Sequence, residues 1–355
     1  MVVKLRNKIQ HYDWGSPWAI PDLLDIANPE EKPMAELWMG AHPRAPSEIP
    51  EKNITLIDYI EKDPETVLGK KVAEKFSSHL PFLFKVLAAE RILSIQAHPN
   101  KKQAEEGFER ENRLGIPIDA PHRNYRDDNH KPELLCALTD FTGLRGFRPV
   151  DEIRRDWELL ELSEHFPAFT DLSDFFTKLL ELGKEEKAGL IQKAIAFAER
   201  CEEERDEQRF VLLRKIALEY PLDVGALAPL YLNVVNLKPG EAMFLPAQML
   251  HAYVQGTGIE VMANSDNVLR GGCTSKHIDA EELLKVLDFT AYPLEILDPG
   301  DSEDIEFHYR SPASEFSLSR IRLSADGRRA AREEYEEREE SERREKVGSY
   351  QPSSQ

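Results

Sequence analysis

The sequence predicts a mostly β protein with a helical insertion, because the hydrophobic period changes twice along the chain. Short apolar runs bounded by turn residues occur over residues 80–147 and again over 228–263, as expected for strands. Between them, over residues 150–224, apolar residues recur at helical spacing. Short strands with turns between them favour a barrel or a double-sheet jelly roll. A chain of 355 residues also exceeds what one core usually serves, so we expect two or three domains.

Residues 1–149 form the first part of the predicted β domain. The runs LPFLFKVL and RILSIQAHP, within residues 80–99, are short, apolar and bounded by breakers, as buried antiparallel strands are. Residues 100–114 predict a polar helix capped by Asn100. We expect a loop over residues 122–133, then a strand and a turn over 134–147.

Residues 150–224 predict four helices whose outer faces are densely charged. Their apolar residues fall into four groups at helical spacing: Ile153, Trp157 and Leu160; Phe176, Leu179 and Leu180; Ile191, Ala194, Ile195 and Ala198; and Leu213, Ile216, Ala217 and Tyr220. We expect this insertion to serve as a lid or wall rather than to carry chemistry.

The β pattern resumes over residues 225–285, in the order strand, turn, strand, loop, strand. Turn signals occur at Pro239-Gly240 and at Gly256-Thr257-Gly258. The spacing Gly240-x5-Pro246, followed by His251, is similar to one half of a cupin signature. Together with residues 1–149, this segment would complete one jelly roll.

The last part of the chain changes character. Residues 286–325 predict three more strands, one of them within EFSLSRIRLS. Residues 326–347 are almost all Arg and Glu and lack a hydrophobic stripe, so a helix there would have nothing to bury. We expect residues 326–355 to form a charged, mobile tail.

Composition excludes several classes of function. The net charge of −19 argues against sequence-independent nucleic-acid binding, which needs basic surfaces. No apolar run approaches the length of a membrane span, and the N-terminus lacks the features of a secretory signal, so we expect a cytoplasmic protein. The three cysteines have no CxxC spacing, which excludes a cysteine-rich zinc site and predicts buried or half-buried thiols. An anionic substrate would require a local cluster of Lys and Arg.

One group of residues could bind a metal ion. Residues i and i+2 of a strand face the same side, so Gln96 and His98 can reach one point inside a barrel, where Glu133 and His251 could join them. Two imidazoles, a carboxylate and an amide oxygen would leave a position open for water or substrate, as catalytic zinc requires. Gln is an uncommon zinc ligand, and spacing alone favours a buried core His98 and a surface Glu133 over a metal site.

A second group lies in residues 258–279. Arg270 and Lys276 could meet an anion there, and Gly271-Gly272 would allow close backbone approach. Glu260 and Asp266 supply carboxylates in the same stretch. Taken alone, this pattern favours a charged loop beside the start of a helix over an anion site.

Five stretches together resemble the type I mannose-6-phosphate isomerase family. The similarity covers roughly residues 1–300 and is most specific in the motifs QAHP, DxNHKPE, LHAY and SDNVxRGG. The stretches are AELWMGAHPRAPSEI, LPFLFKVLAAERILSIQAHPNKKQAEEGF, NYRDDNHKPELLCALTDFTGLRGFRP, LNVVNLKPGEAMFLPAQMLHAYVQG and IEVMANSDNVLRGGCTSKHID.

The resemblance implies a fold and a metal. It implies a catalytic cupin domain, here residues 1–149 and 225–285, with the helical insertion at 150–224 and a second jelly roll that is only partial over 286–325. It also implies one Zn²⁺ per chain, with the family's ligands at Gln96, His98, Glu133 and His251. The LHAY motif departs from the commoner PHAY, but its ligand His is present.

The implied reaction interconverts mannose 6-phosphate and fructose 6-phosphate through an enediol, which needs acid/base groups near both carbons and stabilisation of a developing oxyanion. Lys131 and Asp266 are candidate proton carriers. Arg270 suits oxyanion or phosphate stabilisation, because it is always charged. Glu260 also matches a family active-site position. The resemblance implies that Ser94, Lys85 and Lys276 complete a cationic, hydrogen-bonding cleft, and that His130 acts in opening the sugar ring.

The implied partners are few. A sugar phosphate is the substrate, no nucleic acid or membrane is involved, and the protein is expected to be a monomer that feeds mannose metabolism and GDP-mannose supply. The alternative function is a non-catalytic cupin that binds a sugar phosphate without converting it.

Overall fold

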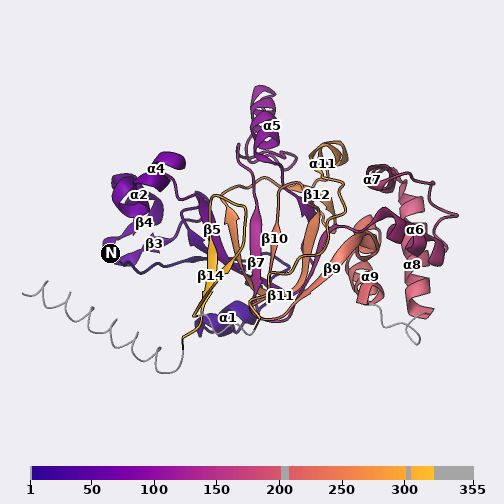
Figure 1. Cartoon of the computed structure of the whole chain (residues 1–355), viewed down its shortest axis with the longest axis horizontal. Helices are drawn as coiled ribbons and strands as arrows, with labels where there is room; N and C mark the ends of the chain where they lie inside the picture. The colour runs from indigo at the N-terminus through magenta and orange to yellow at the C-terminus, as the bar shows by residue number, and fades with distance from the viewer. Residues whose placement is uncertain (1, 201–207, 301–304, 324–355) are drawn as a thin grey trace, which may run out of the picture. The chain divides into compact units, whose positions relative to one another are not determined.

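The structure, a computed structural model, describes residues 2–200, 208–300 and 305–323. The chain divides into two units, one made of Met1–Asp298 and Ser311–Ser317, the other of Pro299–Arg310 and the chain from Leu318. The first unit holds two antiparallel sheets and helices α1–α11 (Figure 1). The second contains the hairpin of β13 (Glu306–Tyr309) and β14 (Leu318–Ile321). The charged tail predicted at 326–355 lies outside the described residues.

The first sheet is built on the long strand β5, as predicted from its apolar run. Its strands pair antiparallel in the order β1-β2-β5-β11-β7-β10. Their bounds are β1 (Lys8–Gln10), β2 (Glu36–Gly40), β5 (Phe82–Ala89), β11 (His251–Ala263), β7 (Glu133–Ala137) and β10 (Ala242–Leu245). A separate short pair is formed by β3 (Glu48–Ile49) and β4 (Ile54–Thr55).

The second sheet also uses β11. Its antiparallel order is β12-β6-β11-β8-β9, with β12 (Leu269–Gly272), β6 (Ile95–Ala97), β8 (Phe141–Phe147) and β9 (Leu232–Leu237). The strands predicted within residues 80–147 and 228–263 are thus present.

Strand β11 passes from one sheet to the other near its middle. Its first half pairs with β6 and β8, and its second half, from Gly256, pairs with β5 and β7. The register on β8 shifts between Tyr253 and Gln255, and Gly256 takes φ +122°. A Cβ on Gly256 would lie 2.6 Å from the backbone oxygen of Asp140. The prediction of a chain-reversing turn at Gly256-Thr257-Gly258 is therefore wrong, because the glycines here allow a bend inside one strand.

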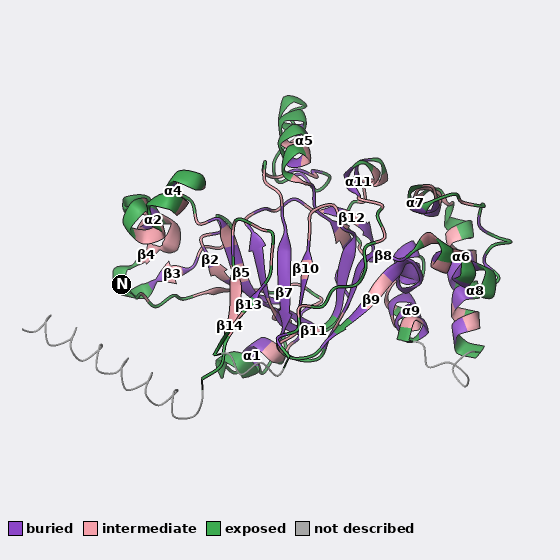
Figure 2. Ribbon diagram, in the orientation of Figure 1, coloured by how far each residue is buried: buried purple, intermediate pink, exposed green. Residues whose placement is uncertain are grey.

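The inner faces of the two sheets pack against each other. One apolar cluster contains Leu87, Leu135 and Met243 of the first sheet together with Val235 and Tyr253 of the second. The strands are accordingly buried along most of their length, as Figure 2 shows. Because successive side chains of a strand point to opposite faces, a residue two positions from a member of this cluster points to the same inner face.

The helical insertion covers the outer face of the second sheet. A single core cluster joins Ile95, Leu144 and Leu269 of that sheet to Trp157 and Phe175 of the helices. The four predicted helices are present as α6 (Val150–Leu159), α7 (Leu172–Glu181), α8 (Lys184–Arg200) and α9 (Gln208–Glu219).

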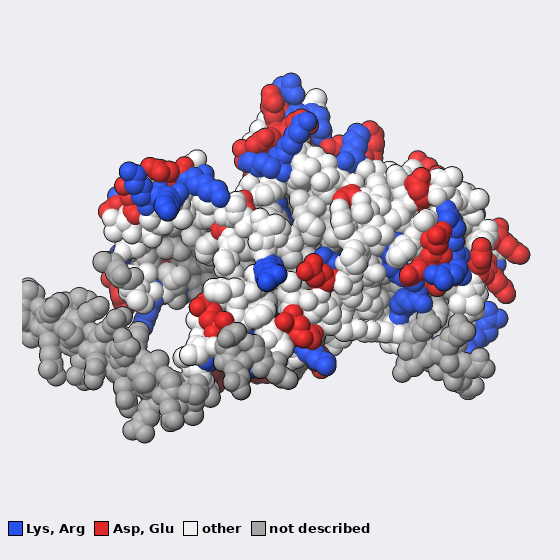
Figure 3. All heavy atoms as spheres, viewed as in Figure 1, with Lys and Arg blue, Asp and Glu red and all other residues white. Residues whose placement is uncertain are grey.

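The remaining helices are shorter or surface-exposed. Helix α5 (Lys101–Arg113) begins as predicted at Asn100, whose side chain accepts a hydrogen bond from the backbone N–H of Gln103. Figure 3 shows Lys, Arg, Asp and Glu side chains intermixed over α5 and over the helices at both sides. The others are α1 (Ala19–Leu24), α2 (Leu56–Lys62), α3 (Pro64–Leu68), α4 (Lys70–Lys75), α10 (Ala228–Tyr231) and α11 (Ala280–Val286), with 3₁₀ turns at Pro50–Lys52 and Val224–Leu227. Among the helices that the structure describes, none is long and apolar enough to cross a membrane.

Two expectations about secondary structure need correction. The fold contains more helix than strand, 33% against 23%, so the expectation of a mostly β protein is wrong in this respect. Helices α2–α4 were not predicted because they are short and have no long apolar stripe. Of the three strands predicted over 286–325, the described residues contain two, β13 and β14. Cys136 and Cys273 are buried, as expected, and Cys201 lies outside the described residues.

The crossing of β11 predicts a stability effect at Gly256. Gly256→Ala should lower the free energy of unfolding by about 3 kcal/mol or more, because it adds both a disfavoured φ and overlap with Asp140 and Phe141. Gly115→Ala is the matched control, since Gly115 has φ +70° with nothing within 4 Å of its added Cβ, and should cost about 1–2 kcal/mol. Urea unfolding measures both, and equal losses would contradict the steric account of the crossing.

Candidate metal centre

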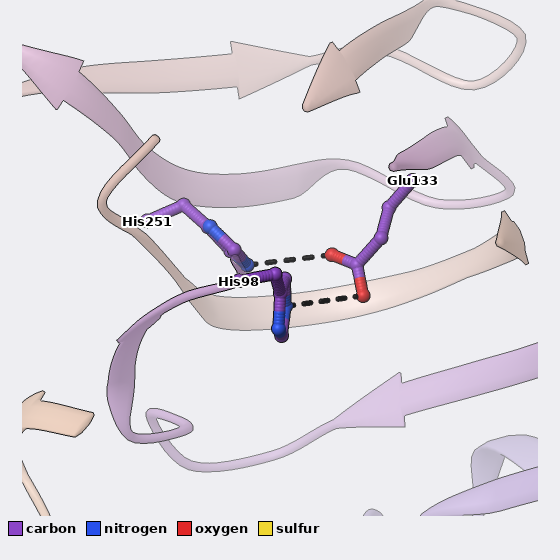
Figure 4. Close-up of side chains that lie close together, drawn as sticks. All are labelled: His98, Glu133 and His251. Carbon is purple, nitrogen blue, oxygen red and sulfur yellow. Dashed lines mark ion pairs between the residues drawn. The ribbon is translucent and has the colours of Figure 1, made fainter. Parts of the chain in front are cut away.

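Three buried side chains converge where the two sheets meet. His98, Glu133 and His251 each offer one ligand atom, and these atoms lie within 4.8 Å of one another. The Nε2 atom of His98 is 3.5 Å from Oε1 of Glu133, and Nε2 of His251 is 3.3 Å from Oε2 (Figure 4). His98 directly follows β6, Glu133 opens β7 and His251 opens β11, so the sheets bring together positions far apart in the sequence.

The atoms that face the centre fit a metal ion. Both Nε2 atoms and both Glu133 oxygens are buried, and apart from the Lys131 side chain beside Oε1 none has a hydrogen-bond partner, which is costly unless something else binds them. The Nδ1 of His98 donates to the backbone oxygen of Asn267 (2.6 Å), and the Nδ1 of His251 donates to that of Met249 (2.9 Å). These bonds fix the tautomer that leaves each Nε2 lone pair free, the usual arrangement around ligating histidines. Two imidazoles and a carboxylate are a donor set of catalytic zinc sites.

Electrostatics keep His98 and Glu133 in their ligating forms. Burial, reinforced by the nearby Lys131 ammonium, lowers the pKa of His98 to about 4, so the imidazole is neutral. Burial alone would raise the pKa of Glu133, but Lys131 and His98 outweigh it and hold that pKa well below its usual value. The Nζ of Lys131 lies 2.9 Å from Oε1 of Glu133. The centre therefore holds a buried carboxylate beside the neutral ring of His98.

Gln96 lies on the same face as this group. Its Cα is paired with His251 on β11 and with Arg270 on β12, and directly paired residues of neighbouring strands project to one side. The Ser94 hydroxyl donates to Oε1 of Gln96 at 3.4 Å. A role for Gln96 as a fourth ligand stays a prediction.

A second buried cluster surrounds Lys85. Its ammonium pairs with Glu260 and, at 3.2 Å, with Glu36. The indole N–H of Trp38 donates to Glu36 at 2.7 Å, and the hydroxyl of Tyr253 donates to Glu260 at 2.8 Å. Lys85 and Glu260 also pair in register between β5 and β11. The sequence analysis found these two residues but missed Glu36 and Tyr253, although Tyr253 follows His251 at the spacing that places both on one face.

Burial and neighbouring charges affect the pKa values of Lys85 and Glu260 differently. Burial opposes the Lys85 cation, but the carboxylates of Glu260, Glu36 and Glu133 outweigh burial and raise its pKa. Burial raises the pKa of Glu260 as well, and of its neighbours Glu133 adds to this rise while Lys85 opposes it. Glu260 is thus more easily protonated than an ordinary carboxyl, whereas Lys85 stays charged.

Three cationic side chains lie near one another, and among the described residues no carboxylate pairs with them. In the described part of the chain, the side chains of Arg126, Arg270 and Lys276 form neither a hydrogen bond nor an ion pair. Burial and the neighbouring Arg126 lower the pKa of Arg270, and burial followed by Arg270 and Arg126 lowers that of Lys276. Mutual repulsion among unpaired cations is the arrangement expected of an anion site. Sequence reasoning missed Arg126, although it opens the RDDNHKPE segment.

Asp266 and His130 have specific partners. The carboxylate of Asp266 is 3.0 Å from a guanidinium nitrogen of Arg44 and 3.6 Å from Nε2 of His42. The Nε2 of His130 lies 2.8 Å from Oε1 of Glu315, a residue of the segment Ser311–Ser317 that belongs to the first unit. Neither Arg44 nor Glu315 was expected near the cleft, because their separation in sequence gives no sign of it.

The sequence is similar to those of known phosphomannose isomerases. The model of the phosphomannose isomerase type I catalytic domain matches residues 2–150. A mannose-6-phosphate isomerase from Salmonella typhimurium is 45% identical over 327 residues, covering 89% of this chain and 82% of that protein. The Homo sapiens mannose-6-phosphate isomerase is 38% identical over 321 residues, covering 81% and 73%.

The structure is also similar to solved structures of phosphomannose isomerases. A zinc-bound mannose 6-phosphate isomerase superposes with a TM-score of 0.81 at 44% identity, covering 91% of this chain and 83% of that one. A mutant of phosphomannose isomerase from Salmonella typhimurium reaches a TM-score of 0.84 at 43% identity, with the same coverage. Sequence, fold and the buried metal-ligand group agree, and the chain belongs to the type I phosphomannose isomerase family.

Proposed function

We propose that this chain interconverts mannose 6-phosphate and fructose 6-phosphate with one zinc ion per chain. The observation that carries the proposal is the group His98, Glu133 and His251, whose buried facing atoms have no hydrogen-bond partner apart from the Lys131 side chain beside one Glu133 oxygen. Relatives that cover most of this chain bear the name mannose-6-phosphate isomerase, and one related structure contains zinc. No observation favours the non-catalytic sugar-phosphate-binding protein.

The finer description of the fold is part of the proposal. We assign the two sheets that share β11 to a cupin-type jelly roll made of residues 1–149 and 225–285, with residues 150–224 as its helical insertion. Residues 286–325 would be a partial second jelly roll. A cytoplasmic location, a monomeric state and a role in GDP-mannose supply stay predictions.

The metal would be held by His98, Glu133 and His251, with Gln96 as the proposed fourth ligand. Bound there, zinc supplies a Lewis acid that polarises or positions the oxygens of the open-chain sugar. The Nδ1–H bonds of both histidines to backbone oxygens hold the rings in orientation.

The protein's own groups would move the protons. In the aldose-to-ketose direction C2 loses a proton and C1 gains one, while the proton on O2 leaves and O1 acquires one. We assign these transfers to Lys131 and Asp266: the carboxylate of Asp266 lies beside Arg44, and the side-chain nitrogen of Lys131 lies beside Glu133. Glu260, held by Lys85 and Tyr253, would line the cleft beside them.

The phosphate would bind the unpaired cations. Arg270 and Lys276 were expected in this role from the sequence. We add Arg126, because its positive charge lowers the pKa values of both. Such a local cluster offsets the net charge of −19. Ser94 and His130 are proposed to contribute hydrogen bonds to the sugar.

A metal-removal assay tests the reaction. Chelation should abolish the conversion of mannose 6-phosphate to fructose 6-phosphate, and added zinc should restore it, measured with a coupled assay. Glu133→Gln, which removes the ligand charge without changing size, should lower kcat/KM by about 100-fold or more, whereas the exposed-site control Glu65→Gln should not. Zinc-loaded, folded protein that binds the sugar phosphate without turnover would favour the non-catalytic alternative.

Exchange of substrate protons tests the proton carriers. Asp266→Asn and Lys131→Met should each lower kcat by about 100-fold or more and slow the incorporation of solvent deuterium into the sugar. Asp128→Asn is the control, because Asp128 is exposed and lies on the loop that leads into Lys131. A variant that keeps its zinc and its kcat would remove that residue from the assignment.

Arg126 tests the phosphate site. Arg126→Ala should raise KM for mannose 6-phosphate by about 10- to 100-fold, as loss of a charge-assisted hydrogen bond does, with a smaller effect on kcat. Arg113→Ala, at the exposed end of α5, should leave KM unchanged. An unchanged KM in Arg126→Ala would place the phosphate elsewhere.

A further inference from the structure

Two loops lead from different parts of the chain to residues of the proposed site. Residues 126–129 lead into Lys131 and Glu133, and residues 264–267 follow β11 and lead into Arg270. Both loops are joined by side-chain hydrogen bonds, and one residue takes part in most of them. That residue, Asn267, has a fully buried side chain and was not singled out by its sequence.

The Asn267 amide is saturated by the opposite loop. Its Oδ1 accepts from the backbone N–H groups of Arg126 (2.6 Å) and Asp127 (3.2 Å). Its Nδ2 donates to the backbone oxygens of Asp127 (2.8 Å) and Asn129 (2.9 Å), and to Oδ1 of Asp127 (3.2 Å). An asparagine side chain offers two donors and one acceptor oxygen, and each of them is used here.

Neighbouring bonds strengthen the same junction. The Ser265 hydroxyl donates to the backbone oxygen of Asn129 and accepts from the backbone N–H of Asn267. The backbone N–H of Asp266 donates to Oδ2 of Asp127 at 2.7 Å. Burial raises the pKa of Asp127, as expected for a carboxyl enclosed between two loops.

The backbone of Asn267 also touches the metal centre. Its carbonyl oxygen accepts the Nδ1–H of His98 at 2.6 Å. The position of that oxygen depends on the loop, and the loop is held by the Asn267 side chain. The same residue thus connects the orientation of His98 to the loop that carries Arg126 and continues to Lys131.

We infer that Asn267 is a positioning residue that couples the metal site to the substrate cleft. Its backbone fixes the His98 imidazole for the metal, and its side chain holds the loop of residues 126–129 in place. The substrate part of this inference rests on the proposed function, whereas the metal part does not. Loss of such outer contacts lowers metal affinity by about 10- to 100-fold.

Asn267→Asp is the decisive variant because it keeps the size of the side chain. It replaces two N–H donors with an oxygen that faces the carbonyl oxygens of Asp127 and Asn129, so the loops should separate. We expect the dissociation constant for zinc, measured on the full chain without substrate by competition with a chromogenic chelator, to rise by about 10- to 100-fold. KM for mannose 6-phosphate should rise as well.

Asn28→Asp is the matched control. The Asn28 amide also donates to two backbone oxygens, of Pro17 (2.8 Å) and Lys32 (2.9 Å), and accepts one backbone N–H, but it has no contact with the metal ligands. Its zinc affinity should equal that of the unmodified chain. The visible spectrum of the Co²⁺-loaded protein should change in Asn267→Asp and not in Asn28→Asp, which a general loss of stability would not produce.

The outcomes separate cleanly. Folded Asn267→Asp protein with unchanged zinc affinity, or an equal loss in both variants, would overturn the inference. If Asn267→Asp does not fold, Ser265→Ala removes only the hydroxyl of the junction and should still raise the zinc dissociation constant, while an unchanged constant would count against it. Absence of isomerase activity in the unmodified chain would reject the proposed function, and the zinc comparison would still decide the metal part.

Discussion

The path of β11 is the constraint on which the site depends. By pairing with β6 and β8 first and with β5 and β7 afterwards, this strand fixes the relative position of the two sheets. The register shift after Tyr253 changes which alternate residues face inward. His251 therefore points to the interior from one sheet, and Glu260 does so from the other. Without the shift, one of these two side chains would face the opposite side of its sheet.

The interior between the sheets is apolar in one part and ionic in another. Where Leu87, Leu135 and Met243 pack, the sheets are held by the hydrophobic effect. Where Lys85 and Glu133 lie, buried charges are tolerated because each has an opposite charge at contact distance. Such pairs add little to stability, but breaking one would leave an uncompensated charge.

Function is concentrated where this internal pairing is incomplete. Both Nε2 atoms and Oε2 of Glu133 at the metal centre have no hydrogen-bond partner, and the cations Arg126, Arg270 and Lys276 repel one another. A divalent cation satisfies the first group and a phosphate the second. The junction at Asn267 lies between the two, so that one buried amide can hold both in a common arrangement.

Much of the local structure could be predicted from the sequence alone. The Asn100 cap determines where α5 begins, helical periodicity determines α6–α9, and apolar runs determine β5 and β7, because these features depend on neighbours within a few residues. The motif residues His98, Glu133 and His251 could be named as ligands only through the family resemblance, because their spacing alone favoured a buried core His98 and a surface Glu133.

The tertiary structure decided what those patterns leave open. Gly256 is a turn signal locally, yet it lies inside β11, since pairing with β5 and β7 outweighs a local preference for reversal. The partners Glu36 for Lys85 and Arg44 for Asp266 are separated from them by 49 and 222 residues. Asn267 gains its importance only from the loop packed against it. Sequence determines which groups are present, but strand register and loop packing determine which of them meet.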